Sequence, residues 1–500
     1  MRQGETRPHD NGNRALSGMA LMRSRYVRRA DSPNAVIVVL CMVGIVAALG
    51  GTLLVPLVSR LPEIYDVSAV QASWIITSTL LAGALATPIL TRLADMFGER
   101  LIIVATLIGL VLGSLLLAVS DSFALAIVGR SLQGVAAALV PVAMSLMKHV
   151  LPPERVGFGV ALMSGTLGAG SALGLPLAGF MYTHLGWNSL FWGLAIVGAL
   201  LAFLVWTMLP KRVTSKQSID WFGALLLTVA LTPLVLVVTQ GNVWGWLSRP
   251  IIGLALLSLV AFLAWVPWER RQRDPIVHLG LLVLRPVALT NIVAIIIAMA
   301  MLINLFLAGQ QLAVPEFVAG GLGLSADATG LVMAFPAGAV AAASPLAARL
   351  LRRFGGRWVL VAGALFMAAS YVARVLLDGS VFEVALGAVL VCVGTCLALS
   401  AMPMIIMAAV PSEHTASANG INTLCRMLGT SLSTAGMAAV TSFTAVTFDG
   451  TEYPTTETYH LLFWACVVLS VAAALLTTAI PRRDQLPDGL VTESATAPLR

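Results

Sequence analysis

The sequence predicts an all-α polytopic membrane protein of about fourteen transmembrane helices, and two observations support this fold class. Of the 500 residues, 58% are hydrophobic and only 11% are charged, and the mean hydropathy is +0.92. A soluble domain carries roughly 25% charged residues, so this chain lacks the polar surface that a soluble protein of its size needs. The apolar residues also form runs of about 20 residues, the length that crosses a bilayer.

The apolar runs follow one another along the whole chain. Because backbone groups in lipid must be hydrogen-bonded internally, each run is expected to be a helix. In chain order the predicted helices are 35–58, 70–92, 101–119, 123–147, 156–182, 188–209, 219–239, 250–268, 287–317, 325–347, 357–377, 380–409, 417–443 and 459–480. The polar stretches 1–34 and 481–500 are predicted to be tails, with disorder expected over 1–33 and 485–500. The first tail is longer than the basic region of a signal peptide.

The distribution of charge predicts the orientation in the membrane. An even number of helices puts both termini on one side. Most of the 30 Lys and Arg residues lie in the tails and in the loops on that side, whereas the opposite loops carry mainly acids. Basic loops stay cytoplasmic, so both termini are predicted to be cytoplasmic, in a plasma or inner membrane. This asymmetry accounts for the net charge of +7 without a nucleic-acid partner.

An internal repeat divides the chain. Residues 87–100 read TPILTRLADMFGER and residues 344–357 read SPLAARLLRRFGGR, so Pro, Arg, Leu, Phe, Gly and Arg recur in register. Two homologous halves are typical of a transporter that rocks around a site between them. The spacing of the repeat predicts a six-helix bundle over 35–210, two additional helices over 211–270 and a second six-helix bundle over 271–480.

The first copy of the repeat contains a candidate cytoplasmic gate formed by Asp95, Gly98 and Arg100. Gly98 allows a tight turn, and Asp95 could cap the N-terminus of the next helix or pair with a nearby Arg, which would latch the cytoplasmic side in one state. The turn resembles the loop motif of the major facilitator superfamily, Gly-x-Leu-x-Asp-Arg-x-Gly-Arg-Arg, although Thr91 replaces its first Gly and Met96 its central Arg. The alternative is a turn that only connects two helices.

Arg130 lies inside the fourth predicted helix, where a charge costs on the order of 3 kcal/mol. Gln133 lies near it at helical spacing. The pattern Arg130-Ser-Leu-Gln133-Gly resembles the fourth-helix motif of the superfamily, and the resemblance implies a role for Arg130 in proton coupling. The alternative is an Arg that extends to the membrane interface.

The fifth predicted helix carries Gly170, Gly174, Pro176 and Gly179, and small residues of this kind allow helices to approach closely. The run resembles the antiporter motif Gly-x-x-x-Gly-Pro-x-x-Gly-Gly, with Leu175 where Pro is expected and Ala178 where Gly is expected. The alternative is generic helix packing.

Asp220-Trp221-x-Gly223 and other features resemble the fourteen-helix drug:proton antiporter branch of the superfamily. That branch usually has an Asp in its first helix, in a Leu-Asp-x-Thr pattern, but this chain reads Leu-Gly-Gly-Thr at 49–52. A proton carrier must be a titratable group, and Glu316 near the outer end of the ninth helix is the remaining candidate. The alternative for Glu316 is a solvated charge at a helix end.

Polar residues on the membrane helices are candidates for the substrate cavity, because they usually face the interior of the bundle. They could equally join helices by hydrogen bonds. The candidates are Gln133, Asn304, Gln311, Asn422 and Arg426.

No catalytic set, no metal-ligand spacing and no phosphate-binding loop is apparent, so the sequence predicts no enzyme, no metal and no cofactor. The resemblance implies a monomer in the lipid bilayer that exports small amphipathic organic compounds in exchange for protons. Because the first-helix Asp is missing, a metabolite exporter or a uniporter without proton coupling remains the alternative. A membrane enzyme should show a cluster of His, Asp or Glu at an interface, which the sequence lacks, and a scaffold would not need Arg130 or the repeated turn.

Overall fold

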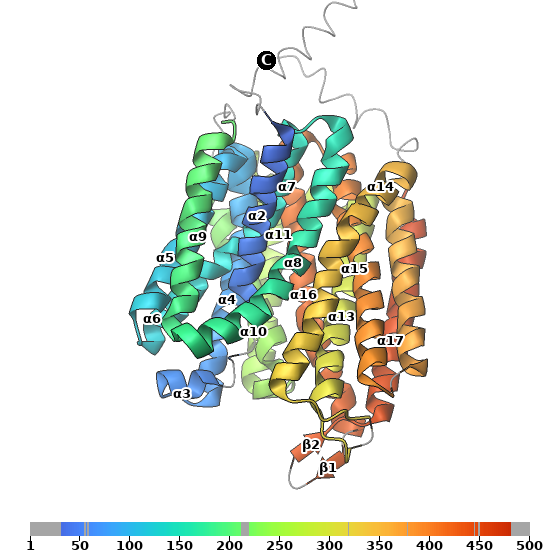
Figure 1. Ribbon diagram of the computed structural model, residues 1–500. Coiled ribbons are helices and arrows are strands. Elements are labelled where there is room, and N and C mark those ends of the chain that lie inside the picture. The colour runs from blue at the N-terminus through green and yellow to red at the C-terminus, as the bar shows by residue number, and fades with distance from the viewer. Residues whose placement is uncertain are drawn as a thin grey trace, which may run out of the picture.

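The computed structural model is a bundle of long helices that run between two ends (Figure 1). At one end α2 (Pro33–Thr52) begins and α17 (Thr456–Thr478) ends, and we call this end the terminal face. A hairpin of β1 (Val446–Phe448) and β2 (Thr451–Tyr453) lies at the other end, the hairpin face. The structure describes residues 32–481 apart from 55–56, 58–59, 212–219, 319, 378, 445 and 449–450. The predicted disordered tails therefore lie almost wholly outside the described residues.

The first part of the chain forms helices α2 to α9. Turns with glycine at positive φ separate consecutive helices, at Gly98 (φ +97°) between α4 and α5 and at Gly186 (φ +83°) between α8 and α9. A capping box of Ser68 and Gln71 begins α4. After α2 the elements are α3 (Leu61–Tyr65), α4 (Ala69–Phe97), α5 (Glu99–Val119), α6 (Phe123–Gly134), η2 (Val135–Ala138), α7 (Leu139–Val150), α8 (Pro153–Leu185) and α9 (Trp187–Met208).

The second part of the chain continues with helices α10 to α17. Its longest helix has 51 residues and contains one non-helical position, Gly355, with φ +76°. Gly355 is the repeat's equivalent of Gly98, so both copies of the repeat turn the chain at a glycine. Before α17 the elements are α10 (Trp221–Trp244), α11 (Arg249–Arg271), α12 (Leu279–Leu282), α13 (Arg285–Ala313), α14 (Ala326–Leu376), α15 (Val381–Ala409), η3 (Ser412–His414) and α16 (Thr415–Thr444).

Twelve helices among the described residues are long and apolar enough to cross a membrane. The candidate span in α14 has 49 residues, more than twice the roughly 20 needed, so Gly355 divides it into two crossings. α16 is not among the twelve because polar residues such as Asn419, Asn422 and Arg426 lower its hydropathy, yet it has 30 residues. The all-α membrane fold is confirmed, and these helices are compatible with the predicted fourteen.

Several predicted helix limits were wrong. The first helix ends at Thr52 rather than at residue 58, after the weak helix formers Gly50 and Gly51. The ninth ends at Ala313 rather than at residue 317, because Val314 is extended before Pro315. The fourth is interrupted by the 3₁₀ segment η2. The short helices α3 and α12, the turn η3 and the hairpin were not predicted.

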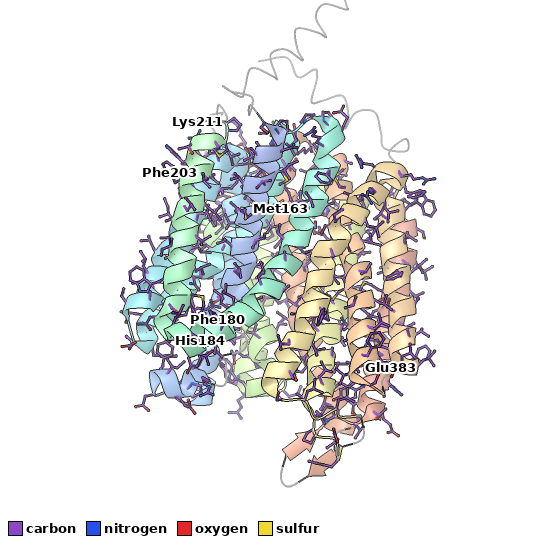
Figure 2. The ribbon with its side chains drawn as sticks, viewed as in Figure 1. Met163, Phe180, His184, Phe203, Lys211 and Glu383 are labelled. Atoms are coloured by element: carbon purple, nitrogen blue, oxygen red, sulfur yellow. The ribbon has the colours of Figure 1, made fainter. Side chains whose placement is uncertain are left out.

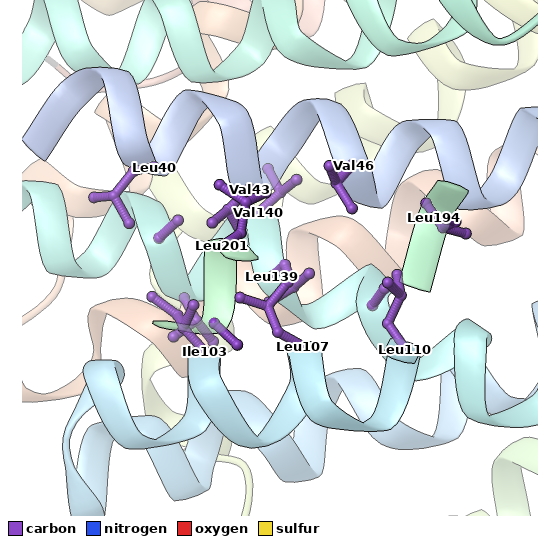
Figure 3. Close-up of a cluster of buried hydrophobic side chains, with 14 of the residues drawn as sticks. Leu40, Val43, Val46, Ile103, Leu107, Leu110, Leu139, Val140, Leu194 and Leu201 are labelled. Atoms are coloured by element: carbon purple, nitrogen blue, oxygen red, sulfur yellow. The ribbon is translucent and has the colours of Figure 1, made fainter. Parts of the chain in front are cut away.

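Five hydrophobic clusters lie among the described residues, and the three largest hold the helices together. The first joins α2, α5, α7 and α9 through side chains such as Leu40, Leu107, Leu139 and Leu201 (Figure 3). The second lies mainly over α13, α14, α15 and α17. A third packs α10 and α11 against α4 and α16. These three clusters are compatible with two bundles and an additional helix pair. The boundaries 35–210, 211–270 and 271–480 stay a prediction.

The outer surface of the bundle is apolar. Phe203 is 64% exposed and lies on the outside of α9, between Lys211 at the terminal face and His184 toward the hairpin face (Figure 2). Many other large apolar side chains are exposed on the long helices, including Leu256, Val260 and Leu475. Apolar surface of this extent needs lipid around it, so the chain is a multi-pass membrane protein.

Candidate functional site

Arg130 on α6 is 2% exposed and lies inside the first bundle. Its Nη1 donates to the Gly50 carbonyl of α2 at 2.9 Å and to Gln133 Oε1 at 2.7 Å. Its Nε donates to the Ile75 carbonyl of α4 at 3.4 Å. The guanidinium therefore joins three helices, and it does not extend to the membrane interface.

The Gly50 carbonyl explains how Arg130 is held without the first-helix Asp. Gly50 occupies the position at which the fourteen-helix antiporter branch usually carries that Asp. A backbone oxygen thus accepts the hydrogen bond that a carboxylate could have accepted. Such an oxygen satisfies the donor but leaves the positive charge of Arg130 without neutralisation from this position.

Gln133 connects Arg130 to α5. Its Nε2 donates to Ser114 Oγ at 2.9 Å, while its Oε1 accepts from Arg130. Close backbone contact makes this arrangement possible, since a Cβ on Gly113 would lie 2.4 Å from the Gly129 carbonyl. Gln133 is 3% exposed. Its amide is therefore committed to the Arg130 site in this conformation, and its role in a substrate cavity stays a prediction.

Asp95 connects the first bundle to α16 at the terminal face. Its Oδ1 accepts from the Ala416 backbone N–H at 3.0 Å and its Oδ2 from that of Ser417 at 2.8 Å. The Ser417 hydroxyl also donates to Oδ2. A carboxylate at a helix N-terminus is favoured by these free N–H groups and by the helix dipole. We call this contact the Asp95 latch.

Lys148 on α7 makes a second contact between the two bundles. Its Nζ donates to the Met407 carbonyl at 2.8 Å, near the end of α15, and to Thr415 Oγ1 at 3.0 Å. Sequence analysis did not single out Lys148, because nothing in its sequence neighbourhood identifies a partner more than 250 residues away. With the Asp95 latch, it fixes the segment from Met407 to Ser417 against α4 and α7.

Gly98 and Arg100 shape the turn beside the latch, and the second repeat copy does the same elsewhere. Arg100 donates to the Leu209 carbonyl at 2.9 Å and to the Trp206 carbonyl, so it caps the end of α9. Arg357, its repeat equivalent, donates to the Thr478 carbonyl at the end of α17. The second copy has an exposed Arg352 at the position of Asp95, so it cannot form an equivalent carboxylate latch.

The glycines of α8 are positions of close helix contact. A Cβ on Gly170 would lie 2.4 Å from Ala48 Cβ, and one on Gly174 would lie 2.3 Å from Thr52 Oγ1, both on α2. On Gly168 a Cβ would lie 2.3 Å from Val340 Cβ of α14. Gly179 has nothing within 4 Å of such a Cβ. α8 runs through residue 176, but the Pro176 side chain lies outside the described part of the structure.

Asn304 and Gln311 on α13 bind a second buried arginine, Arg374 of α14. Its Nη1 donates to Asn304 Oδ1 at 2.7 Å and its Nη2 to Gln311 Oε1 at 3.0 Å. The guanidinium also lies 4.3 Å from the Phe463 ring centre. Sequence analysis did not assign Arg374 a role, although a charge inside the predicted helix 357–377 was the available signal. The predicted cavity role of the two amides stays a prediction.

Asn422 and Arg426 lie on α16, which packs against both α4 and α13. Asn422 Nδ2 donates to Asn291 Oδ1 at 3.1 Å, and Arg426 Nη2 donates to Thr423 Oγ1 at 3.2 Å. Glu316 lies apart from both, exposed in the turn after α13. The structure therefore places Asn422 against α13 and Arg426 against its own helix, both within the second bundle, and leaves Glu316 at the hairpin face.

In the part of the chain that the structure describes, no group of three His, Cys, Asp or Glu side chains could hold a metal ion. The sites built here are buried arginines, a carboxylate latch between two bundles and glycine-lined helix contacts. Together with the apolar exterior they define a two-bundle membrane transporter. The chain belongs to the Major Facilitator Superfamily, whose family model matches residues 40–310 and 294–499.

The sequences of two bacterial transporters are similar to this chain over most of its length. The multidrug export protein EmrB of Haemophilus influenzae is 30% identical over 383 residues, which cover 73% of this chain and 72% of that protein. The uncharacterized MFS-type transporter YhcA of Bacillus subtilis is 25% identical over 340 residues, or 68% of this chain. The match spans 63% of YhcA, just under two thirds of its length.

A solved structure supports the fold. The human organic anion transporter MFSD10 superimposes with a TM-score of 0.63 at 15% sequence identity, covering 89% of this chain and 99% of that one. At this identity the likeness concerns the fold alone. The family model and the similarity to EmrB, and not this superposition, make the protein a membrane transporter.

Proposed function

We propose that this transporter exports small amphipathic organic compounds, such as drugs or toxic compounds, across the cell membrane in exchange for protons. The terminal face is then cytoplasmic, as the distribution of basic residues predicts. The observation that carries the proposal is Arg130, buried between α2, α4 and α6 and bound to Gly50 and Gln133. Relatives with export functions, such as EmrB, support the direction of transport.

The mechanism we infer uses the Asp95 latch as the cytoplasmic gate. In the conformation described here the latch joins α4 to α16, so the two bundles are closed to each other at the terminal face. Release of the latch would allow the bundles to rock apart there, around the α8 contacts with α2 and α14. Transport would then alternate the access of the site between the two faces.

The charge of Arg130 is the basis for proton coupling in this proposal. A positive charge fixed in the membrane favours the deprotonated state of a nearby acid and opposes the binding of other cations. In the state described here, Glu316 is exposed. If Glu316 is the coupling carboxylate, the state of the transport cycle in which the terminal face is open must bury it.

One observation favours a second candidate, a metabolite exporter or uniporter of the same fold without proton coupling. The first helix offers Arg130 a backbone carbonyl from Gly50 rather than a titratable carboxylate. A transporter built in this way could move its substrate down a gradient with no proton exchange.

Proton movement in proteoliposomes distinguishes the two candidates. We would impose a pH gradient on purified protein and add lipophilic cations, neutral amphipathic drugs and amphipathic anions in turn. Antiport predicts proton movement with at least one class, and Arg130→Ala should abolish it while Arg249→Ala, a matched change of an exposed Arg, should not. Substrate that equilibrates in the wild type with no proton movement would establish the uniporter instead.

A further inference from the structure

Beside the Asp95 latch lies a buried acid and histidine pair that the proposed function does not use. Glu99 is the first residue of α5 and its side chain is fully buried, while His149 near the end of α7 is 11% exposed. His149 Nδ1 lies 2.7 Å from Glu99 Oε1. His149 Nε2 lies 3.0 Å from the carbonyl oxygen of Ser412, in the segment between α15 and α16. Both bundles therefore meet at this imidazole ring.

The two partners of His149 fix the number of protons in this pair. The Ser412 carbonyl can only accept, so Nε2 must carry a hydrogen. At Nδ1 the hydrogen lies between a ring nitrogen and a carboxyl oxygen, and it belongs either to an imidazolium facing a carboxylate or to a carboxylic acid facing a neutral ring. Both arrangements contain the same number of protons, one more than a neutral histidine beside a free carboxylate.

We propose that Glu99 and His149 form a proton-binding site that exists only while the terminal face is closed, so that closing this face takes up one proton and opening it releases one. The reason is the Ser412 carbonyl. When the segment around Ser412 withdraws, Nε2 loses the acceptor that required its hydrogen. The pair can then release the additional proton, because a neutral ring can still donate from Nδ1 to a carboxylate.

Charged and titratable groups on several neighbouring elements make contacts of their own. The Asp95 carboxylate interacts with Glu99 electrostatically, and its hydrogen bonds go to α16. The other neighbours are committed as follows: Arg100 to the end of α9, Lys148 to Met407 and Thr415, Arg155 to Asn34, and His414 to Glu413 and to the His278 ring. The Ser145 hydroxyl donates to Glu99 Oε1 at 3.2 Å, which favours the carboxylate form.

The site also has a defined side. Since His149 is partly exposed at the terminal face, the pair exchanges its proton with the solution on that side. The pH of that solution should therefore set the balance between closed and open states even in the absence of substrate. This differs from proton coupling through Arg130, since a uniporter with the same latch would show the same pH response.

The test measures the opening of the terminal face directly. Spin labels on Lys211→Cys after α9 and Arg353→Cys in α14, both exposed, report the separation of the two bundles in lipid nanodiscs without substrate or pH gradient. Protein that carries only the native cysteines is labelled in parallel to subtract its signal. From about pH 5 to about pH 9 the ratio of closed to open protein should fall about tenfold per pH unit within one window, as for a single proton.

Two substitutions separate a titrating pair from a structural one. His149→Gln should remove the pH step. Glu99→Gln should also remove it but keep the face closed at high pH, because the Gln amide can donate to Nδ1 and replace the proton. His414→Gln, the matched change of a neighbouring histidine, should leave the step in place. A wild type without a pH step, a step lost in His414→Gln, or a step retained in both pair variants would overturn the proposal.

Discussion

Arg130 in the first bundle and Arg374 in the second are both buried, and neutral oxygens bind each of them. Arg130 binds the Gly50 carbonyl and Gln133, and Arg374 binds Asn304 and Gln311. A charge in the membrane costs on the order of 3 kcal/mol, so such acceptors are necessary for the fold. They also leave the charge available to bias a titratable group, which is the property that proton coupling requires.

Replacing Gly50 tests whether a carboxylate beside Arg130 adds coupling. A Cβ at this position would make ordinary contacts with Leu110 and Leu194, at 3.6 and 3.7 Å, so a small side chain fits. Gly50→Asp should increase the number of protons moved per substrate in proteoliposomes, because Arg130 stabilises the ionised acid. Gly50→Asn has nearly the same shape without a titratable group, and an equal increase in that variant would contradict the explanation.

His278 predicts a loss of stability in acid. Burial, helped by the nearby His414 and Arg92, lowers the pKa of His278 to about 3. The ring is therefore neutral in the folded protein but is protonated below about pH 6.5 in the unfolded chain. Its contribution to stability is complete above about pH 6.5 and falls by at most about 1.4 kcal/mol per pH unit as the pH drops toward 3.

Thermal unfolding in detergent between pH 7 and pH 5 measures this effect. His278→Phe keeps an aromatic ring against His414, whose ring centre lies 3.9 Å away, but removes the titration. We expect its melting temperature to decrease less across this range than that of the wild type. Parallel curves for the two proteins would rule out His278 as the source.

Some residues could be predicted from sequence and their partners could not. Arg130 could be identified because it is a charge in an apolar helix. Gly98 could be identified because the turn that contains it recurs in the second copy of the repeat. The partner of Arg130 is a backbone carbonyl, which carries no side-chain signal at Gly50. The partners of Asp95 are N–H groups of Ala416 and Ser417, more than 300 residues away. Such contacts depend on how the bundles meet and not on local sequence.

At the scale of the element, α8 shows how small residues position whole helices. Gly168→Ala would place a Cβ 2.3 Å from Val340 Cβ and 2.7 Å from the Ala337 carbonyl, so α8 and α14 would have to separate. Overpacking of this kind costs about 1–3 kcal/mol. We expect a lower melting temperature and slower transport, because α8 and α14 belong to different bundles.

Gly179→Ala is the matched control on the same helix. Nothing lies within 4 Å of its Cβ position, and Ala is the better helix former by about 0.5–1 kcal/mol. Its stability should be unchanged or slightly higher, with normal transport. Equal losses in both variants would mean that helix flexibility, and not close contact with α14, is what the glycines provide.

Hydropathy located the helices but not their interruptions. The predicted ranges all overlap helices because a run of apolar residues in lipid has no other structure to adopt. The 3₁₀ segment η2 and the end of α13 at Ala313 were missed. The first is a small change of backbone angle and the second a turn to extended backbone at Val314, but both occur at apolar residues and leave no mark on hydropathy. The end of α13 matters most, because it places Glu316 in an exposed turn.

At the scale of the whole molecule, three polar contacts between the bundles gather at the terminal face. Asp95 binds the start of α16, Lys148 binds the end of α15, and His149 binds the segment between them. They lie together on one short stretch of the second bundle, from Met407 to Ser417. One movement of that stretch would therefore break all three, which favours a gate that is either closed or open.

Reactivity of a buried cysteine tests this gate in the complete transport cycle. Ala416 is fully buried under the Asp95 latch, and Ala416→Cys keeps the backbone N–H that the latch uses. Its reaction with a polar maleimide should be slow in the closed state. Asp95→Asn replaces charge-assisted hydrogen bonds with weaker ones, a loss of about 1.5 kcal/mol, and should raise the reaction rate roughly tenfold. Glu154→Cys, exposed on the same face, should react quickly in both backgrounds. Since Asp95 touches only the gate, an unchanged rate at Ala416→Cys would mean that the remaining contacts hold the face closed and that Asp95 serves the turn alone.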